Sequence, residues 1–414
     1  MDISSIDTEG DTERRQFLAF GSLLLCGTAG CLRLSNGGTT STSTPSGRAQ
    51  SETRSDSPEP TSYPPLELEL AAELEFSGTN SSPGTKFAAV DDSRIAAVGG
   101  KAVKIVNIDR LAVEISVPIP NVSNFGSHGI ISHGGSVYAA VGGSSNAQVI
   151  KIAPESGEMW RFEEDAFGPN VLRKIGGPVT TESVVAVTVA TTDNREGESD
   201  TRIYLLDAES GELIVSPEAT PGEEDSLYTT GIAAGTGFVV LSGHDGYYFY
   251  DVAAREYVGN TRGYGGEEPV VHDGVFYTGK AAYDVSTREQ QWENSGGPAS
   301  VGTTLTDDSM YYGTPVSGVS LEDGTLRWTH DPDGTVRGIA TAGDGDVWAG
   351  TDRNTEPGFL YRIDAEDGSV LGASELPRAG DSPISTPFGL IRHGDRLFVG
   401  SSNSLVAYDV DSSA

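Results

Sequence analysis

Beyond Pro65, hydrophobic and polar residues alternate in short runs that are separated by turns rich in glycine and aspartate. In 89–99 and in 131–142, an apolar run is followed by a polar turn and by a second apolar run that ends in glycine. Such alternation is the pattern of a half-buried β-strand. Comparable pairs of runs begin near Val179, Ile232, Val270, Thr304, Ala340 and Leu390. The chain therefore predicts eight copies of one strand unit, about 43 residues apart, the length of a four-stranded propeller blade.

A more specific motif follows several of these pairs and predicts the third and fourth strands of each unit. Residues 206–211 read Leu-Asp-Ala-Glu-Ser-Gly, and 363–368 read Ile-Asp-Ala-Glu-Asp-Gly. The aspartate of such a turn accepts hydrogen bonds from nearby backbone N–H groups, and the glycine takes a left-handed conformation that other residues avoid. In three copies a tryptophan follows the turn. We expect these indoles to dock between neighbouring blades: Trp160, Trp292 and Trp328.

This Leu-Asp-Ala-x-(Ser/Thr)-Gly-x-x-x-Trp unit resembles the pyrroloquinoline-quinone-like propeller repeat. That repeat occurs in quinoprotein alcohol dehydrogenases and in the lipoprotein propeller of the bacterial β-barrel assembly machine. The resemblance extends over residues 66–413, although the first, fourth and eighth copies keep little of the motif. It implies a propeller fold, and it leaves open whether the chain is an enzyme or a binding protein.

The last copy stops after its third strand, at 405–410, whereas 66–76 is a spare alternating segment ahead of the first copy. Such a segment can supply the missing strand and leave the ring with short, protected edges. We therefore predict an all-β fold over residues 66–414, a single eight-bladed β-propeller of four-stranded antiparallel blades whose ring is closed by an N-terminal strand. An amphipathic helix is the alternative for 66–76, because alanine and glutamate favour helix.

The N-terminus has the pattern of an export signal. Arg14 and Arg15 precede Phe-Leu and an apolar stretch, which resembles a twin-arginine signal. The stretch ends at Cys31 after small residues, which resembles a lipobox, with Thr28 where the bacterial pattern has leucine. We predict a signal and lipobox in 1–31, followed by a disordered tether in 32–65, which is dominated by Ser, Thr, Pro and Gly. The protein is thus expected on the outer face of the cell membrane, anchored by lipid at Cys31.

The charge of the chain narrows its environment and its partners. There are 60 acidic and 27 basic residues, a formal net charge of −33. Such a surface repels nucleic acid, and molar salt is needed to screen its self-repulsion. The composition resembles that of proteins from halophilic archaea, an acidic mesophilic surface protein being the alternative. We therefore expect no nucleic-acid partner, and a monomeric propeller that binds other membrane or surface proteins.

The residues required for quinoprotein catalysis are not recognisable in the sequence. Those enzymes hold a calcium ion and an aromatic floor under the quinone, and many use adjacent cysteines, which this chain lacks. Three histidines, His133, His272 and His393, occupy the same strand-to-strand turn of different copies, too far apart for one metal. We predict no catalytic residue, no metal and no cofactor. The alternative is a quinone-dependent dehydrogenase-like enzyme that uses pyrroloquinoline quinone with calcium.

Basic and aromatic residues gather in the loops expected on one rim of the ring. Arginine binds carboxylate and phosphate through paired hydrogen bonds. The rim residues expected to hold an anionic or peptide-like ligand are Arg173, Lys174, Arg262, Tyr264, Arg337 and Arg353. The alternative is that each arginine pairs locally with a neighbouring acid. Asn80 and Asn121 begin N-glycosylation sequons. We expect a non-catalytic cell-surface scaffold.

Overall fold

The computed structural model describes residues 63–410, with gaps. The gaps are 77–84, 100, 120–121, 144–146, 165–170, 194–198, 216–226, 244–245, 263–268, 295–302, 342–344, 353–357, 377–388 and 402–403. Residues Thr61–Ala414 form one compact unit. In the described part, no helix is long and apolar enough to cross a membrane. The residues singled out from the sequence that lie outside it are Arg14, Arg15, Thr28, Cys31, Asn80, Asn121, Tyr264 and Arg353.

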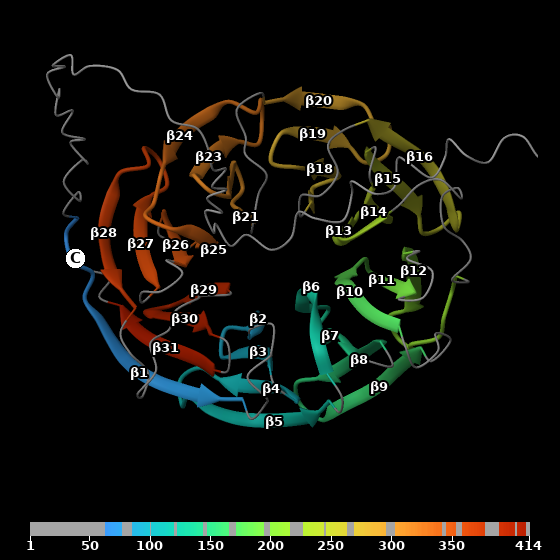
Figure 1. Ribbon diagram of the computed structural model, residues 1–414, viewed down its shortest axis with the longest axis horizontal. Helices are drawn as coiled ribbons and strands as arrows, with labels where there is room; N and C mark the ends of the chain where they lie inside the picture. Colours follow the sequence, from blue (N-terminus) through green and yellow to red (C-terminus); the bar gives the residue numbers. More distant parts are fainter. Residues whose placement is uncertain are drawn as a thin grey trace, which may run out of the picture. The chain divides into compact units, whose positions relative to one another are not determined.

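The described strands form eight antiparallel sheets around a ring, so the prediction of an eight-bladed propeller is confirmed (Figure 1). Blade one contains β2 (Lys86–Asp91), β3 (Arg94–Gly99), β4 (Ala102–Asn107) and β5 (Ala112–Pro118). Blade two contains β6 (Val122–His133), β7 (Ser136–Gly143), β8 (Ala147–Ala153) and β9 (Gly157–Glu164). Blade three contains β10 (Val171–Thr180), β11 (Val184–Asp193) and β12 (Ser199–Asp207). Blade four contains β13 (Leu227–Gly235), β14 (Phe238–Gly243), β15 (Gly246–Asp251) and β16 (Glu256–Arg262).

The second half of the ring repeats this order from the centre outwards. Blade five contains β17 (Val270–His272), β18 (Val275–Tyr277), β19 (Ala281–Asp284) and β20 (Gln290–Glu293). Blade six contains β21 (Thr303–Leu305), β22 (Ser309–Tyr312), β23 (Val316–Ser320) and β24 (Leu326–His330). Blade seven contains β25 (Thr335–Thr341), β26 (Asp346–Asp352), β27 (Phe359–Asp364) and β28 (Val370–Glu375). Blade eight contains β29 (Gly389–His393), β30 (Arg396–Gly400), β31 (Ser404–Val410) and β1 (Leu68–Glu75).

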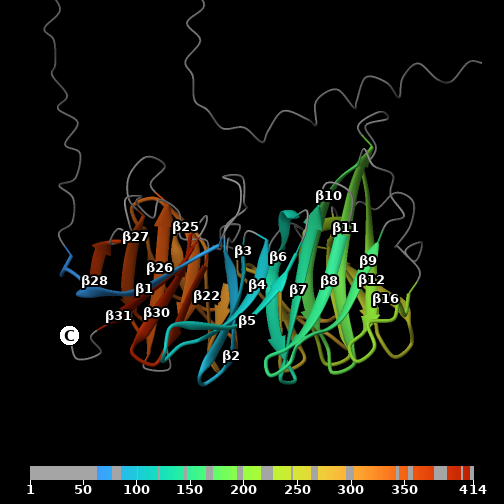
Figure 2. The same cartoon turned by 90° about the horizontal axis from the view of Figure 1, so that it is seen from below.

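Blade three differs from the others in its outermost strand. Among its described residues, three strands form the sheet, and a single bridge from Leu213 to Leu206 marks the place of a fourth. Its inner strands are long, and β10 and β11 extend beyond the neighbouring strands at one rim of the ring (Figure 2).

The hydrophobic core is divided among the junctions between blades. Side chains of a strand alternate between its two faces, and in β3 Ile95 and Ala97 pack towards blade eight while Ala96 and Val98 pack towards blade two. The same division recurs around the ring, giving one apolar cluster for each junction. The middle strands read as continuous apolar runs because both of their faces are buried.

The turn between the third and fourth strands is held by its aspartate. In blade three, Asp207 Oδ1 accepts hydrogen bonds from the N–H groups of Ser210 and Glu209, at 2.8 and 3.1 Å. These bonds, with one from the Ser210 hydroxyl, lower the pKa of Asp207. Gly211 then adopts φ of 75° and donates its N–H to the Asp207 carbonyl at 2.9 Å. In blade five, Arg288 takes the same left-handed place with φ of 65°.

Three tryptophans pack on the corresponding turn of the next blade. In each case the indole N–H donates to the carbonyl of the residue after the turn aspartate or its substitute, and the ring lies against the turn glycine. The three contacts are Trp160 with Ala208 and Gly211, Trp292 with Leu321 and Gly324, and Trp328 with Ala365 and Gly368. This packing joins blade two to three, five to six and six to seven.

The ring is closed by the strand that precedes blade one. β1 pairs antiparallel with β31, from Leu68 opposite Val410 to Glu75 opposite Ser404, and Phe76 is buried between blades eight and one. The strand prediction for 66–76 is therefore confirmed and the helix alternative is wrong. The Ala373 N–H donates to the Pro64 carbonyl at 2.8 Å, so contacts with the ring begin within the segment 32–65 that we assigned to the tether.

A glycine substitution tests the tryptophan contact. A Cβ atom added at Gly368 would lie 2.6 Å from Trp328 Cδ2, whereas one at Gly394 meets nothing within 4 Å. Both glycines have positive φ, so both alanine variants carry backbone strain. Gly368→Ala should lower the free energy of unfolding by about 1–3 kcal/mol more than Gly394→Ala, because it overpacks the junction. Chemical denaturation at constant salt measures both, and equal losses would contradict this account.

Candidate functional site

Two clefts open on the face of the ring that carries the turns from first to second and from third to fourth strands, which we call the hairpin face. The cleft between blades six and seven has a volume of about 720 Å³, and that between blades five and six about 380 Å³. They share Asp307, Asp308 and Arg327. The larger cleft is lined by Thr306, Asp307, Asp308, Tyr311, Arg327, Gly345, Asp346, Asp364, Ala365 and Glu366.

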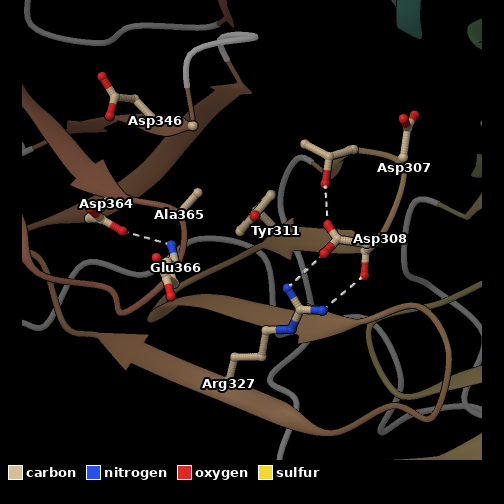
Figure 3. A pocket seen from close by; sticks show the side chains of 10 residues that line it. Asp307, Asp308, Tyr311, Arg327, Asp346, Asp364, Ala365 and Glu366 are labelled. Atoms are coloured by element: carbon tan, nitrogen blue, oxygen red, sulfur yellow. Dashed lines mark hydrogen bonds and ion pairs between the residues drawn. The ribbon is translucent and has the colours of Figure 1, made fainter.

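The blade-six wall of the larger cleft is organised around Asp308. Arg327 on β24 approaches Asp308 Oδ2 with Nη1 at 3.2 Å (Figure 3). Arg327 also donates to Ser309 Oγ at 2.6 Å. The Ser309 hydroxyl donates to Asp308 Oδ1 at 2.9 Å. The hydrogen bond from Ser309 and then that from Arg327 lower the pKa of Asp308, so this carboxylate is charged at neutral pH.

The blade-seven wall is the turn between β27 and β28. The Glu366 N–H donates to Asp364 Oδ1 at 2.7 Å, which fixes the turn, and Tyr311 lies between this turn and Asp308 (Figure 3). Asp346 begins β26 beside the same turn, where Arg362 Nε donates to its Oδ2 at 2.5 Å. Both walls of the cleft therefore rest on hydrogen bonds within regular turns and strands.

The larger cleft carries a net negative charge. Five of its lining residues are carboxylates and one, Arg327, is a cation. Arg362, which does not line the cleft, pairs with Asp346 and offsets its charge. The smaller cleft adds Asp273 and Glu322 to the shared residues. An excess of carboxylates attracts cationic groups and repels phosphate or carboxylate.

At two junctions of the same face, an arginine spans from one blade to the next, and we call each an arginine clasp. Arg94 pairs with Asp91 in its own blade at 2.6 Å and with Glu155 of blade two at 2.8 Å. Arg396 pairs with Asp409 in its own blade at 2.8 Å and donates to the Ile108 carbonyl of blade one. The clasps join blade one to two and blade eight to one.

The structure does not bring the predicted rim residues together as a described site. Arg173 and Lys174 lie on β10 and Arg262 ends β16, with side chains that are not described. Arg337 on β25 is exposed and its Nη2 lies 3.5 Å from Asp352 Oδ2, which is the local pairing that we kept as the alternative. Tyr264 and Arg353 lie outside the described residues.

The hairpin-face residues were missed at the sequence level. The hairpins containing Asp308 and Glu366 were predicted as turns, and no ligand was assigned to their acids. The usable signal was the first residue of each second strand, which is arginine at Arg94 and Arg396 but serine at Ser309. Six of the eight blades have another residue at that place, so aligning the copies would have located the two clasps but not the cleft.

The described residues do not fit a quinone-and-calcium centre. No three His, Cys, Asp or Glu side chains among them come together as metal ligands would. The four tryptophans of the chain are all used in packing: Trp348 is 1% exposed between blades seven and eight, and the other three dock on turn residues. No indole is therefore left to form an open floor for a planar cofactor.

Comparison with known proteins supports the nature of the repeat. A family model described as outer membrane protein assembly factor BamB matches residues 278–414. This match supports pyrroloquinoline-quinone-like propeller repeats in residues 278–414. No curated protein matches it. Among solved structures, the computationally designed Ika8 protein aligns with a TM-score of 0.58 and 13% identity, over 83% of this chain and 100% of that one. BamB from Moraxella catarrhalis aligns with a TM-score of 0.52 and 15% identity, over 84% and 99%. At these identities the likeness shows the fold.

The clasp at Arg94 predicts a pH dependence of stability. Despite partial burial, which opposes the shift, hydrogen bonds from Arg94 and Ser93 lower the pKa of Asp91 from 3.8 to about 2. Because the folded state holds the proton less tightly, the stabilisation is complete above about pH 4 and is lost as the pH falls to about 2. Asp91→Asn should lower the free energy of unfolding by about 0.5–1 kcal/mol at pH 7, and the difference from wild type should shrink across that window. A difference that is independent of pH in denaturation curves would contradict this.

Proposed function

We propose that this protein is a non-catalytic scaffold on the outer face of the cell membrane, which binds a partner protein through the clefts of its hairpin face. The observation that carries the proposal is the pair of adjoining acidic clefts at blades five to seven, which share Asp308 and Arg327. Recognition sites work best when their groups are held in place before binding. Here the walls are turns, fixed by their own hydrogen bonds on a closed ring.

The matched family description supports an assembly or interaction role. Its name, outer membrane protein assembly factor, describes proteins that help to build others. We carry over from it the coarse function of protein interaction. The acidic clefts then favour partners with basic segments. In high salt, long-range attraction is screened within a few ångströms, so binding must depend on direct contacts inside the clefts.

The rim of the opposite face is a second binding surface in this proposal. Arg173, Lys174, Arg262, Tyr264 and Arg353 would contact an anionic or peptide-like ligand there, together with Arg337 when it leaves Asp352. The sequons at Asn80 and Asn121 would carry glycans, because an exported surface protein meets the glycosylation machinery.

A charge reversal in the cleft tests the function. Glu366 and Glu209 occupy the same position in the turns of blades seven and three, and Glu366 lines the larger cleft. Glu366→Lys should weaken capture of a partner from detergent-solubilised membranes at high salt by at least about tenfold, since it places a cation in the site. Glu209→Lys, the matched control, should capture it as wild type does. Equal capture by all three proteins, or none by the wild type, would show that the clefts are not the binding surface.

The proposed anchor makes a separate prediction. Lipidation at Cys31 requires that thiol, whereas Cys26 lies in the apolar stretch of the signal. Cys31→Ser should move the folded protein from the membrane fraction to the medium, and Cys26→Ser should leave it on the membrane. Cell fractionation with immunoblotting measures both. Retention of the Cys31→Ser protein on membranes would overturn the lipid anchor.

The absence of catalysis is tested with the cofactor of the quinoproteins. The full chain is incubated with pyrroloquinoline quinone and calcium, then dialysed and assayed for dye-linked alcohol oxidation. We expect neither retained quinone absorbance nor activity above a heat-denatured sample. Tight uptake with alcohol oxidation would replace the scaffold proposal with a dehydrogenase.

A further inference from the structure

The backbone defines which residues of blades one, eight and six are equivalent. In each of these three blades, the N–H after the third strand donates to the carbonyl just before the second strand. The pairs are Ile108 with Ser93, Val410 with Asp395 and Leu321 with Asp308, at 2.9, 2.9 and 3.0 Å. Each acceptor is followed directly by the first residue of the second strand. These first residues, Arg94, Arg396 and Ser309, therefore occupy one place in the three blades.

An arginine at this place reaches two kinds of acceptor on the next blade. Arg94 Nη1 lies 2.8 Å from Glu155 Oε1 and donates to the Pro154 carbonyl at 3.4 Å. Arg396 Nη1 donates to the carbonyls of Ile108 and, at 3.3 Å, Asp109. In both junctions the guanidinium lies between a carboxylate of its own blade and the backbone of the neighbouring turn.

The junction of blades six and seven has the turn acceptors of a clasp without the arginine. Ala365 and Glu366 are the first two residues after the third strand of blade seven, as Pro154 and Glu155 are in blade two. Ala365 and Glu366 line the cleft. Asp308, directly before Ser309, supplies a carboxylate of blade six, although the places of Asp91 and Asp409 hold Thr306 and Ser320. Ser309 is too short to span the junction, and its hydroxyl turns back to Asp308. The larger cleft therefore opens at a junction that lacks a clasp.

A different contact holds this junction, which explains why the space stays open. Trp328 donates to the Ala365 carbonyl at 2.9 Å from the outer strand. Arg327 also approaches from β24 and engages Asp308 through Oδ2. Asp308 already accepts hydrogen bonds from Ser309 and Thr306 at Oδ1 and from Arg327 at Oδ2. A carboxylate has about four lone-pair sites, so Asp308 can accept a further hydrogen bond.

We infer that the cleft between blades six and seven binds an arginine side chain of the partner, in the place that Arg94 and Arg396 fill within their own junctions. This inference rests on the proposed function and names the chemistry of its partner. A planar guanidinium with five N–H donors can bridge acceptors on two blades at once, which the compact lysine ammonium does less well. The acceptors for it are Asp308, Glu366 and the Ala365 carbonyl.

N-Acetyl-arginine amide is the probe that tests the inference. It is titrated into the full chain at one fixed salt concentration while the backbone amide resonances are followed by NMR. The arginine probe should shift the amides of Ala365 and Glu366, and N-acetyl-citrulline amide, which lacks the charge, should not. N-Acetyl-lysine amide should bind at least about threefold more weakly than the arginine probe. Citrulline or lysine probes that bind as tightly as arginine would overturn the inference.

The most direct test is a variant in which a side chain of the protein itself fills the cleft. Ser309→Arg should restore a clasp, raise the thermal midpoint and weaken binding of the arginine probe at least tenfold. The control is Ser136, which begins the second strand of blade two. Ser136 pairs with His133 in the same way that Arg396 pairs with His393 in blade eight. Ser136→Arg should leave probe affinity unchanged. Unchanged affinity in Ser309→Arg would overturn the inference.

A milder substitution covers the case in which Ser309→Arg fails to fold. Glu366→Gln removes one charge with little change of shape and should weaken the probe at least threefold, while Glu209→Gln should not. The partner-capture assay separates the two proposals. Capture that is sensitive to Glu366→Lys, combined with no probe binding, would leave the scaffold function standing and reject arginine as its ligand chemistry.

Discussion

The interaction on which this propeller depends is the contact between a blade and the turn that ends the third strand of the next, which the described residues make at five of the eight junctions. The turn exposes a carbonyl after its aspartate or equivalent residue, and a donor from the preceding blade satisfies it. Trp328 does this for Ala365, Lys151 Nζ for Ala208 at 2.8 Å, and Arg396 for Ile108. A buried carbonyl without a donor is costly, so this contact, together with the apolar cluster at each junction, fixes how the blades stack.

The choice of donor decides the shape of the hairpin face. An arginine reaches the carbonyl along the face and fills the junction with its guanidinium, as Arg94 does. A tryptophan reaches it from the outer strand and leaves the space beside it open. The two clefts occur at junctions of the second kind, where Trp292 and Trp328 are the donors. A filled junction and an open cleft, the proposed binding surface, thus result from two different donors to the same kind of backbone carbonyl.

The charge of the chain acts on two scales. At −33 the surface repels itself, and salt relieves that repulsion. Locally, some of the acids are held by fixed donors, as Asp308 is held by Ser309 and Arg327. Such acids stay ionised because their charged form is the hydrogen-bonded one. The acidic composition therefore also supplies an ordered, negatively charged face, to which we assign the proposed partner.

The repeat spacing, the turn aspartates and the spare segment 66–76 were enough to predict eight blades and the closing strand. These are local patterns, and their period indicates the secondary structure directly. A ring that lacks one strand can be closed by the one spare segment, 66–76. The candidate site could not be predicted from such local patterns. Asp308 and Glu366 are nearly 60 residues apart along the chain, and no local pattern says that they face each other across a cleft. The sequence by itself determined the fold and the positions along the strands of the side chains that donate hydrogen bonds to the next blade. Only the tertiary structure decided which junctions stay open, because that depends on the reach of side chains between blades.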